Sequence, residues 1–333
     1  MAISLKKVLI TGAFGYLGAR LSKYLAEIGY RVTAFGSNKP SNQYMEWLSF
    51  MDDVIVNDIR DNSIISKLAN RNFDIVIHLI SLDHNKSENE PDYVSSINVM
   101  PVWNLLDKFT KNGLKKFIYF STIQVYGEIP KRIITEDFNP APVNSYGLTH
   151  LLSEDICNYF NYKTETECIN VRLSNSYGSP VFKENNCWWL VINDLCKSAI
   201  EKKKIILKSD GTPQRDFIHG DDVSRAVEVL IESKNYHDNN IFHISSGKTL
   251  TILELAQKVK NIFYKQYGKD IKIILPDSST WEYVKSDISN DNIARYTISD
   301  KKMKNLGFKQ ELNLELGISE IFNYLNKEKV LDD

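Results

Sequence analysis

Short apolar runs alternate with longer amphipathic stretches through the first half of the chain. The runs are KKVLITG, YRVTAF, DVIVND, FDIVIHLI, KKFIYFS and TECINVRLS. Their apolar positions are nearly continuous and rich in β-branched side chains, as in strands of a parallel sheet that is covered on both faces. Stretches with helical spacing separate them at 15–29, 93–113 and 145–162. This alternation predicts an α/β fold with a doubly wound parallel sheet.

A glycine-rich turn joins the first predicted strand to the first predicted helix. The sequence TGAFGYLG places Gly12, Gly15 and Gly18 there. The first glycine permits a tight turn, the second lets the backbone approach a pyrophosphate, and the third lets the helix pack close to the strand. This arrangement predicts a Rossmann-type site for a dinucleotide cofactor. Further predicted cofactor contacts in the turn are Phe14, Tyr16 and Leu17.

The order of elements changes after residue 175. The elements predicted there are a helix at 188–201, a strand at 204–207, and helices near 223–232 and 251–264. We expect residues 1–175 to form the dinucleotide-binding Rossmann domain, with a returning segment near 216–245. Residues 176–333 are expected to form a smaller, mixed α/β substrate-binding domain at the carboxyl edge of the sheet.

The end of the second predicted strand bears on the choice of cofactor. No acid stands there, although a carboxylate at this place would bind a free adenosine 2′-hydroxyl and repel a 2′-phosphate. Ser37, Asn38 and Lys39 offer hydrogen-bond donors instead, so we predict NADP, with NAD as the alternative. The other predicted cofactor contacts are Asp58, Ile59, Leu79, Ile80, Ser81 and Asn98. For Asp58, the alternative interpretation is a helix N-cap.

Composition and charge exclude several classes of protein. Among 333 residues, 41 lysines and arginines oppose 42 aspartates and glutamates, and the net charge of -1 does not favour nucleic acid or an anionic membrane as a partner. No apolar stretch approaches the ~20 residues of a membrane span. Four cysteines without CxxC spacing predict buried thiols rather than a metal site. We therefore expect a cytoplasmic protein without a bound metal.

Ordered motifs run along almost the whole chain. They are GAFGYLG, DIRD, IHLIS, STIQVYG, YGLTH, VRLSNSYG, GTPQRDFIHGDDV, HISSG and ARYTISDKKMKNLGF. Together they resemble the extended short-chain dehydrogenases/reductases, and specifically the NAD-dependent epimerase/dehydratase family that acts on nucleotide sugars. The resemblance implies an NAD(P)-dependent enzyme, a nucleotide-diphosphate sugar as substrate, and a homodimer formed through a four-helix bundle from 93–113 and 145–162.

The resemblance assigns catalytic roles to two residues. Thr122 and Tyr146 occupy the positions that flank the reacting sugar carbon in that family. Tyr146 would pass a proton to or from the sugar oxygen, while Thr122 would hold that oxygen through a hydrogen bond.

The chain departs from the family four residues after Tyr146. The family has lysine there, on the same helical face, whereas this chain has His150. A lysine lowers the pKa of the tyrosine and binds the nicotinamide ribose. Histidine, whose unperturbed pKa is ~6.5, can keep only the second role. Tyr146 should therefore stay protonated, which favours donation to a carbonyl over oxidation of an alcohol.

These features predict a reductase of a keto-sugar nucleotide, with Tyr146 as the proton donor. The alternatives are an NAD-retaining nucleotide-sugar 4-epimerase or 4-dehydrogenase, and a catalytically weak homologue that binds nucleotide sugars. Ile123 and Gln124 stand where family 4,6-dehydratases carry an acid pair, so 4,6-dehydration is not expected.

The resemblance also suggests side chains that contact the substrate. Arg215 and Arg295 match arginines that hold the diphosphate, and Asn175 matches an asparagine that reaches the substrate near the nicotinamide. His84 follows the fourth predicted strand, where some relatives place sugar contacts. An exposed loop histidine is the alternative interpretation of His84.

Overall fold

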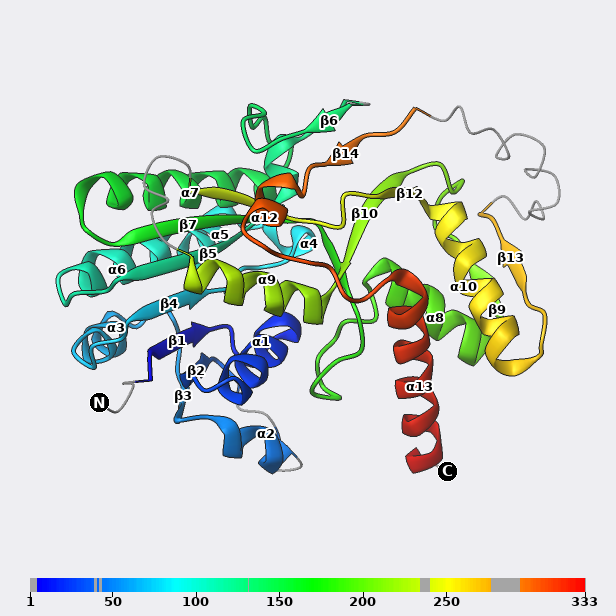
Figure 1. The fold of residues 1–333 in the computed structure, drawn as a ribbon, viewed down its shortest axis with the longest axis horizontal. Helices are drawn as coiled ribbons and strands as arrows, with labels where there is room; N and C mark the ends of the chain where they lie inside the picture. Colours follow the sequence, from blue (N-terminus) through cyan, green and yellow to red (C-terminus); the bar gives the residue numbers. More distant parts are fainter. Residues whose placement is uncertain are drawn as a thin grey trace.

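Among the residues that the structure describes, a parallel sheet of seven strands forms the centre of the molecule (Figure 1), in the order β11-β7-β5-β4-β1-β2-β3. This computed structural model describes residues 5–38, 41, 44–130, 132–233, 240–276 and 294–332. The strands of the sheet are β1 (Lys7–Thr11), β2 (Arg31–Gly36), β3 (Asp53–Val56), β4 (Ile75–His78), β5 (Lys116–Thr122), β7 (Glu167–Leu173) and β11 (Ile241–Ile244). Every neighbouring pair is parallel. The predicted doubly wound α/β fold is therefore confirmed.

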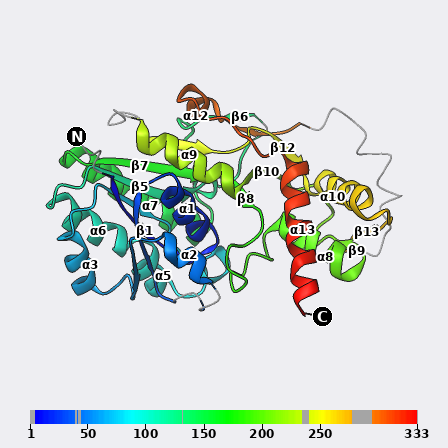
Figure 2. The same cartoon turned by 60° about the horizontal axis from the view of Figure 1, so that its bottom comes forward.

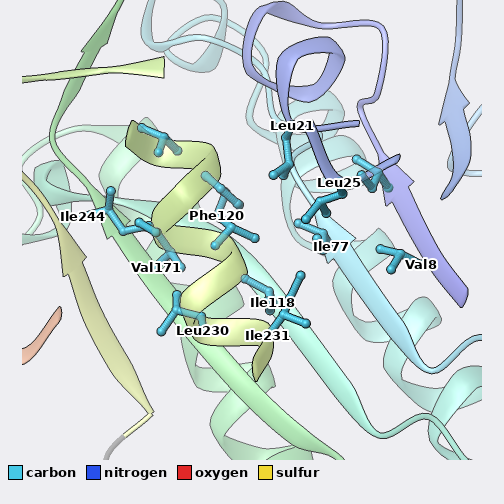
Figure 3. Packing of buried hydrophobic residues seen from close by; sticks show 14 of the residues in the cluster. Val8, Leu21, Leu25, Ile77, Ile118, Phe120, Val171, Leu230, Ile231 and Ile244 are labelled. Atoms are coloured by element: carbon cyan, nitrogen blue, oxygen red, sulfur yellow. The ribbon is translucent and has the colours of Figure 1, made fainter. Parts of the chain in front are cut away.

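Helices cover both faces of this sheet. The helices are α1 (Tyr16–Glu27), α2 (Met45–Phe50), α3 (Asn62–Ala69), α4 (His84–Ser87), α5 (Pro91–Asn98), α6 (Met100–Thr110), α7 (Ser145–Lys163) and α9 (Gly220–Glu232). On one face, Leu25 of α1 and Leu230 of α9 share a buried cluster with Ile77 and Val171 of the strands (Figure 3). On the other face, α3, α6 and α7 bury a second cluster with the alternate strand residues, such as Tyr119. Strand side chains alternate between the faces, so each strand contributes to both cores.

A buried lysine holds the C-terminal end of α9 against the sheet. Lys116 opens β5, and its ammonium donates to the carbonyl oxygens of Leu230 at 2.7 Å, Ile231 at 3.1 Å and Ser233 at 2.7 Å. Glu167, on the neighbouring strand β7, lies 3.2 Å from the same ammonium. A cation at a helix C-terminus satisfies carbonyls that have no partner within the helix. Helix α9 and strand β11 thus return to the Rossmann sheet from the second half of the chain.

The remaining elements form a smaller part of the molecule. Its strands are β8 (Asn175–Tyr177), β10 (Gln214–His219) and β12 (Thr249–Thr251) in one sheet, β9 (Lys204–Ile206) with β13 (Lys272–Ile274), and β6 (Ile133–Ile134) with β14 (Thr297–Ile298). Its helices are α8 (Val191–Lys202), α10 (Ile252–Tyr267) and α13 (Leu314–Asp332). Helix α12 (Lys301–Asn305) lies against β11 instead, and its Met303 belongs to the core of the seven-stranded sheet. Figure 2 shows α8, α10 and α13 together at one end, away from α3 and α6. They share a separate apolar core with β9 and β13. The predicted smaller C-terminal part is present, while the boundary at residue 175 stays a prediction.

The helix predicted at 93–113 is divided in two. Helix α5 ends at Asn98 and α6 begins at Met100, with Pro101 in its first turn. Proline lacks an N–H and restricts the residue before it, so it is tolerated in a first turn but not inside a helix. The sequence pattern of apolar spacing continues across this break, which is why the two helices look like one.

Candidate active site

The glycine turn brings the N-terminus of α1 to the end of β1. Gly12 has a φ of +78°, and a Cβ there would lie 3.2 Å from the carbonyl carbon of Leu79. A Cβ on Gly18 would lie 2.0 Å from the carbonyl oxygen of Gly12, so no side chain fits. Gly15 caps the helix without a side-chain hydrogen bond and is exposed. This cradle fits a cofactor diphosphate, because backbone N–H groups at a helix N-terminus bind anions.

Other predicted cofactor residues surround this turn. Leu79 and Ile80 are half-buried beside Gly12, and Ser37 and Asn38 are exposed after β2. The ring of Phe14 lies so close to Gly36 that a Cβ there would be 2.4 Å from it. Lys39 lies outside the described residues. The turn residues Tyr16 and Leu17 are half-buried at the start of α1.

The structure gives Asp58 and Ile59 local partners. The guanidinium of Arg60 donates to both carboxylate oxygens of Asp58 at 3.0 Å, and this hydrogen bonding lowers the pKa of Asp58. Asp61, not Asp58, caps α3 by accepting from the N–H of Ser63. The N-cap interpretation of Asp58 is therefore wrong. Ile59 is 4% exposed and its side chain belongs to the core, so a contact between Ile59 and a cofactor stays a prediction.

Asn98 joins the end of β4 to α7. Its Nδ2 donates to Thr149 Oγ1 at 3.1 Å, and its Oδ1 accepts from the N–H of Leu82 at 2.8 Å. Asn98 is fully buried, so these bonds fix the loop after β4 next to the helix that carries Tyr146. A direct contact with a cofactor stays a prediction for Asn98.

Thr122 and Tyr146 come from elements that pack closely together. Thr122 ends β5 and caps the short 3₁₀ helix η2 (Ile123–Tyr126) by accepting from the N–H of Gln124 at 3.2 Å. Asn144 caps α7, and a Cβ on Gly147 would lie 2.6 Å from the Gln124 carbonyl oxygen. The start of α7 therefore lies against the turn that follows Thr122. The structure brings the two predicted catalytic residues to the same carboxyl edge of the sheet.

Burial determines the protonation states of Tyr146 and His150. The rings of Tyr146 and His150 are 4.5 Å apart. Burial lowers the pKa of His150 to about 3, although the Phe120 carbonyl opposes the shift. Burial also raises the pKa of Tyr146 to about 12; hydrogen bonding to Ser81 opposes this shift and the charge of Asp83 adds to it. His150 is therefore neutral and Tyr146 protonated at neutral pH.

Three of the predicted substrate residues lie on the smaller part of the molecule. Asn175 begins β8, and its Nδ2 donates to the Asp216 carbonyl oxygen at 2.9 Å. Arg215 on β10 is exposed and donates to the carbonyl oxygen of Gln214 at 2.7 Å. Arg295 forms a two-pronged ion pair with Glu254, at 2.6 and 2.7 Å. His84 begins α4, and its side chain lies outside the described residues.

The sequence interpretation missed two residues that support this site. Tyr119 on β5 contacts His150 through a hydrogen bond of 2.8 Å. Asn185 donates to the carbonyl oxygen of Phe14 at 2.7 Å and so ties the glycine turn to the smaller part of the molecule. The alternation of β5 side chains could have placed Tyr119 on the α7 face, but no motif marked Asn185.

The described residues bear on two further kinds of site, a membrane span and a bound metal. No helix there is both long and apolar enough to span a membrane. No three or more histidine, cysteine, aspartate or glutamate side chains gather there in a way that could hold a metal ion.

Arg295→Ala should destabilise the protein, because the change leaves the half-buried Glu254 without its cation. We expect a loss of ~1–2 kcal/mol at pH 7 in urea unfolding. Arg295 lowers the pKa of Glu254 from 4.5, so its stabilisation is present above that pH and is lost as pH falls through the lowered pKa. Arg215→Ala is the control and should change stability by less than ~0.5 kcal/mol. Equal losses in the two variants would contradict this assignment.

Comparison with known proteins identifies the family. The model of the NAD dependent epimerase/dehydratase family matches residues 8–245. A putative UDP-glucose 4-epimerase of Methanocaldococcus jannaschii is 25% identical over 321 residues, which cover 96% of this chain and 98% of that protein. The dTDP-L-rhamnose 4-epimerase of Burkholderia thailandensis is 25% identical over 366 residues, covering 97% and 96%.

Solved structures share the fold. The UDP-glucuronic acid 4-epimerase of Bacillus cereus, in complex with UDP-glucuronic acid and NAD, has a TM-score of 0.78 at 24% identity and covers 97% of this chain and 99% of its own. The UDP-glucose 4-epimerase of Thermotoga maritima, with UDP-glucose, has a TM-score of 0.81 at 24% identity, with the same coverage. The family model spans more than half of the chain, so the prediction from the motifs is confirmed. This chain is an enzyme of the extended short-chain dehydrogenase type and belongs to the NAD dependent epimerase/dehydratase family.

Proposed function

We propose that this protein is a nucleotide-sugar 4-epimerase. The observation that carries the proposal is the meeting of the glycine cradle, Thr122 and Tyr146 at one edge of the sheet, which hydride transfer at a sugar carbon requires. The reaction class comes from the relatives, whose names are mainly those of 4-epimerases. The keto-sugar reductase predicted from the sequence is not confirmed, and its 4-epimerase alternative fits these relatives better.

The cofactor in this proposal is a nicotinamide dinucleotide on Gly12, Gly15 and Gly18, which would supply the acceptor and donor of hydride when bound. Tyr146 takes the proton of the sugar hydroxyl as the alcohol becomes a ketone, and returns it when the ketone is reduced on the other face. Thr122 holds the same oxygen during both steps. Because the pKa of Tyr146 is raised to about 12, the phenolate needed for oxidation is scarce at neutral pH.

Reduction of a keto-sugar nucleotide is the second candidate, and one observation favours it. The pair of a protonated Tyr146 and a neutral His150 suits donation of a proton better than its removal. The cofactor bears on the choice between the two candidates, because NADP is predicted for the reductase and NAD for the 4-epimerase. Ser37 and Asn38 are exposed directly after β2, where their side chains can donate to a 2′-phosphate, whereas the UDP-glucuronic acid 4-epimerase of Bacillus cereus was solved with NAD. Titration with NADPH and NADH would decide between them.

Tyr146→Phe should abolish interconversion of UDP-sugar C4 epimers while preserving the fold. Incubation with UDP-glucose or UDP-glucuronic acid and either cofactor, followed by NMR of the sugar, measures the product. We expect a loss of ~10²–10⁴-fold, because Tyr146 carries the proton in both steps. Tyr162→Phe is the control on the same helix, since Tyr162 is 94% exposed. Reduction of a 4-keto sugar without epimerisation would favour the second candidate. An active Tyr146→Phe enzyme would refute both.

His150→Lys should speed alcohol oxidation near neutral pH. An ammonium beside Tyr146 stabilises the phenolate and lowers the tyrosine pKa from about 12, so the rising limb of the pH profile for oxidation moves to lower pH. Reduction depends on the protonated tyrosine and should gain nothing. Rates in both directions across pH, for the wild type and the variant, make the comparison. An oxidation profile that does not move would show that residue 150 is not coupled to Tyr146.

We also propose that a second copy of the chain covers α6 and α7. Five large apolar side chains are 43–51% exposed there, and Trp103 stacks on Tyr159 with ring centroids 5.6 Å apart. These side chains are Met100, Trp103, Leu148, Leu152 and Tyr159. An apolar face of this kind is typical of an interface between subunits.

Leu152→Glu should convert the proposed homodimer to a monomer, because the change places a charge in a buried interface. Light scattering coupled to size exclusion measures the mass. Leu316→Glu on α13 is the control, since Leu316 is 53% exposed outside this face. A monomeric wild-type protein at micromolar concentration would refute the interface.

A further inference from the structure

Tyr119 lies directly behind the catalytic edge, between two buried histidines. It is the register partner of His78 on β4, and the centroids of their rings are 6.1 Å apart. On its other side, the ring of His150 from α7 lies 5.7 Å away. Tyr119 is 1% exposed and His150 is 2% exposed, so neither polar group can reach water. Their hydrogen bonds must therefore be made within the protein or to a ligand.

The direction of the hydrogen bond between Tyr119 and His150 sets the tautomer of His150. Tyr119 Oη and His150 Nδ1 are 2.8 Å apart. Burial raises the pKa of Tyr119 well above its usual value, so the phenol keeps its proton. Burial lowers the pKa of His150, so the imidazole is neutral and one ring nitrogen is an acceptor. The Ser153 hydroxyl donates to the carbonyl oxygens of Asn98 and Thr149, so it can only accept from Tyr119, whose pKa it lowers. A phenol that donates to Nδ1 leaves the ring proton on Nε2, whereas a phenol that donates to Ser153 would accept from Nδ1–H.

When the phenol donates to Nδ1, the other nitrogen of His150 is a donor. His150 Nε2 is buried and makes no hydrogen bond to any described residue. Hydrogen bonding to the Phe120 backbone raises the pKa of the ring, but no hydrogen bond of normal geometry joins Nε2 to a described residue. The ring of Tyr146 stands 4.5 Å from that of His150. A buried N–H beside a catalytic tyrosine is therefore available to an acceptor that a ligand brings.

We propose that Tyr119 is a positioning residue that fixes His150 as the Nε2–H tautomer, so that His150 offers one neutral donor to a ribose hydroxyl of a nicotinamide dinucleotide. The inference rests on the proposed function only in the identity of that ligand. It goes beyond the role predicted for His150, because the donor depends on a residue of β5 that touches neither substrate nor cofactor.

A second buried tyrosine–histidine pair provides an internal reference. His243 Nδ1 lies 3.1 Å from the carbonyl oxygen of Ser299, which can only accept, so Nδ1 carries the proton. His243 Nε2 then accepts from Tyr126. His243 should therefore be the Nδ1–H tautomer and His150 the Nε2–H tautomer in the same molecule.

The first test reads these tautomers from the nitrogen chemical shifts of ¹⁵N-histidine in the protein without ligand. His150→Gln assigns the His150 signals by their loss. We expect Nε2–H for His150 and Nδ1–H for His243 in the wild type. Tyr119→Phe, which keeps the ring and removes the hydroxyl, should change the His150 signals and leave those of His243 in place. A wild-type His150 with its proton on Nδ1 would overturn the proposal; this result is read from the wild-type protein, and only the assignment needs a folded His150→Gln variant.

The second test compares a ligand that has the nicotinamide ribose with one that lacks it. Tyr119→Phe should weaken binding of NADPH and NADH by ~2–10-fold, the effect of one hydrogen bond, and leave the affinity for ADP unchanged. In a His150→Gln background, the same change should cause no further loss, because Tyr119 acts through His150. An equal loss for ADP, or an equal loss in the His150→Gln background, would overturn the inference.

These tests separate the inference from the proposed function. The tautomers are measured without substrate, cofactor or turnover, so a protein that epimerises no sugar can still confirm the arrangement. An active epimerase whose Tyr119→Phe variant keeps the wild-type tautomer and the wild-type affinity for NADPH and NADH would contradict the inference alone.

Discussion

The contact between α1 and the glycine turn is the constraint on which the catalytic edge depends. A single methyl group on Gly18 would stand 2.0 Å from the Gly12 carbonyl oxygen, so the helix can approach β1 only where side chains are absent. This approach points the positive end of α1 at the carboxyl edge of the sheet. Strands β1, β4 and β5 are parallel neighbours in the sheet. Gly12, Leu79 and Thr122 therefore end up at one edge, although they are far apart in the sequence.

Desolvation of ionisable side chains governs the chemistry at this edge of the sheet. His78 and His150 are both buried, and burial lowers the pKa of each to about 3. Tyr146 is protonated, and Asp83 is the charged group that acts on its pKa. A lysine at position 150 would bring a fixed cation and three donors, whereas a neutral imidazole brings one donor whose direction is set by its neighbour. In this chain, hydrogen-bond geometry rather than a fixed charge determines which atom of residue 150 carries the proton.

The fold could be predicted because its signals are local. The nearly continuous apolar runs correspond to buried parallel strands, and the glycine spacing corresponds to the turn after Thr11. The break at Val99 was missed because apolar spacing continues past it, although Pro101 was visible. The site was harder to predict, because its contacts join distant residues. Arg295 pairs with Glu254, 41 positions away, and Tyr119 meets His150, 31 positions away. A motif assigns such residues a role but does not show which distant side chain forms an ion pair or hydrogen bond with them.

The return of the chain to the sheet has a consequence during synthesis. Strand β7 ends at Leu173, but its outer neighbour β11 begins only at Ile241. At ~5–20 residues per second, the ribosome needs about 3–13 s to make the intervening chain. During that time the backbone of β7 presents an unpaired edge that contains Ile169 and Val171. An apolar strand edge of this kind pairs readily with other chains. The nascent protein thus passes through an interval of vulnerability to aggregation that closes when β11 docks.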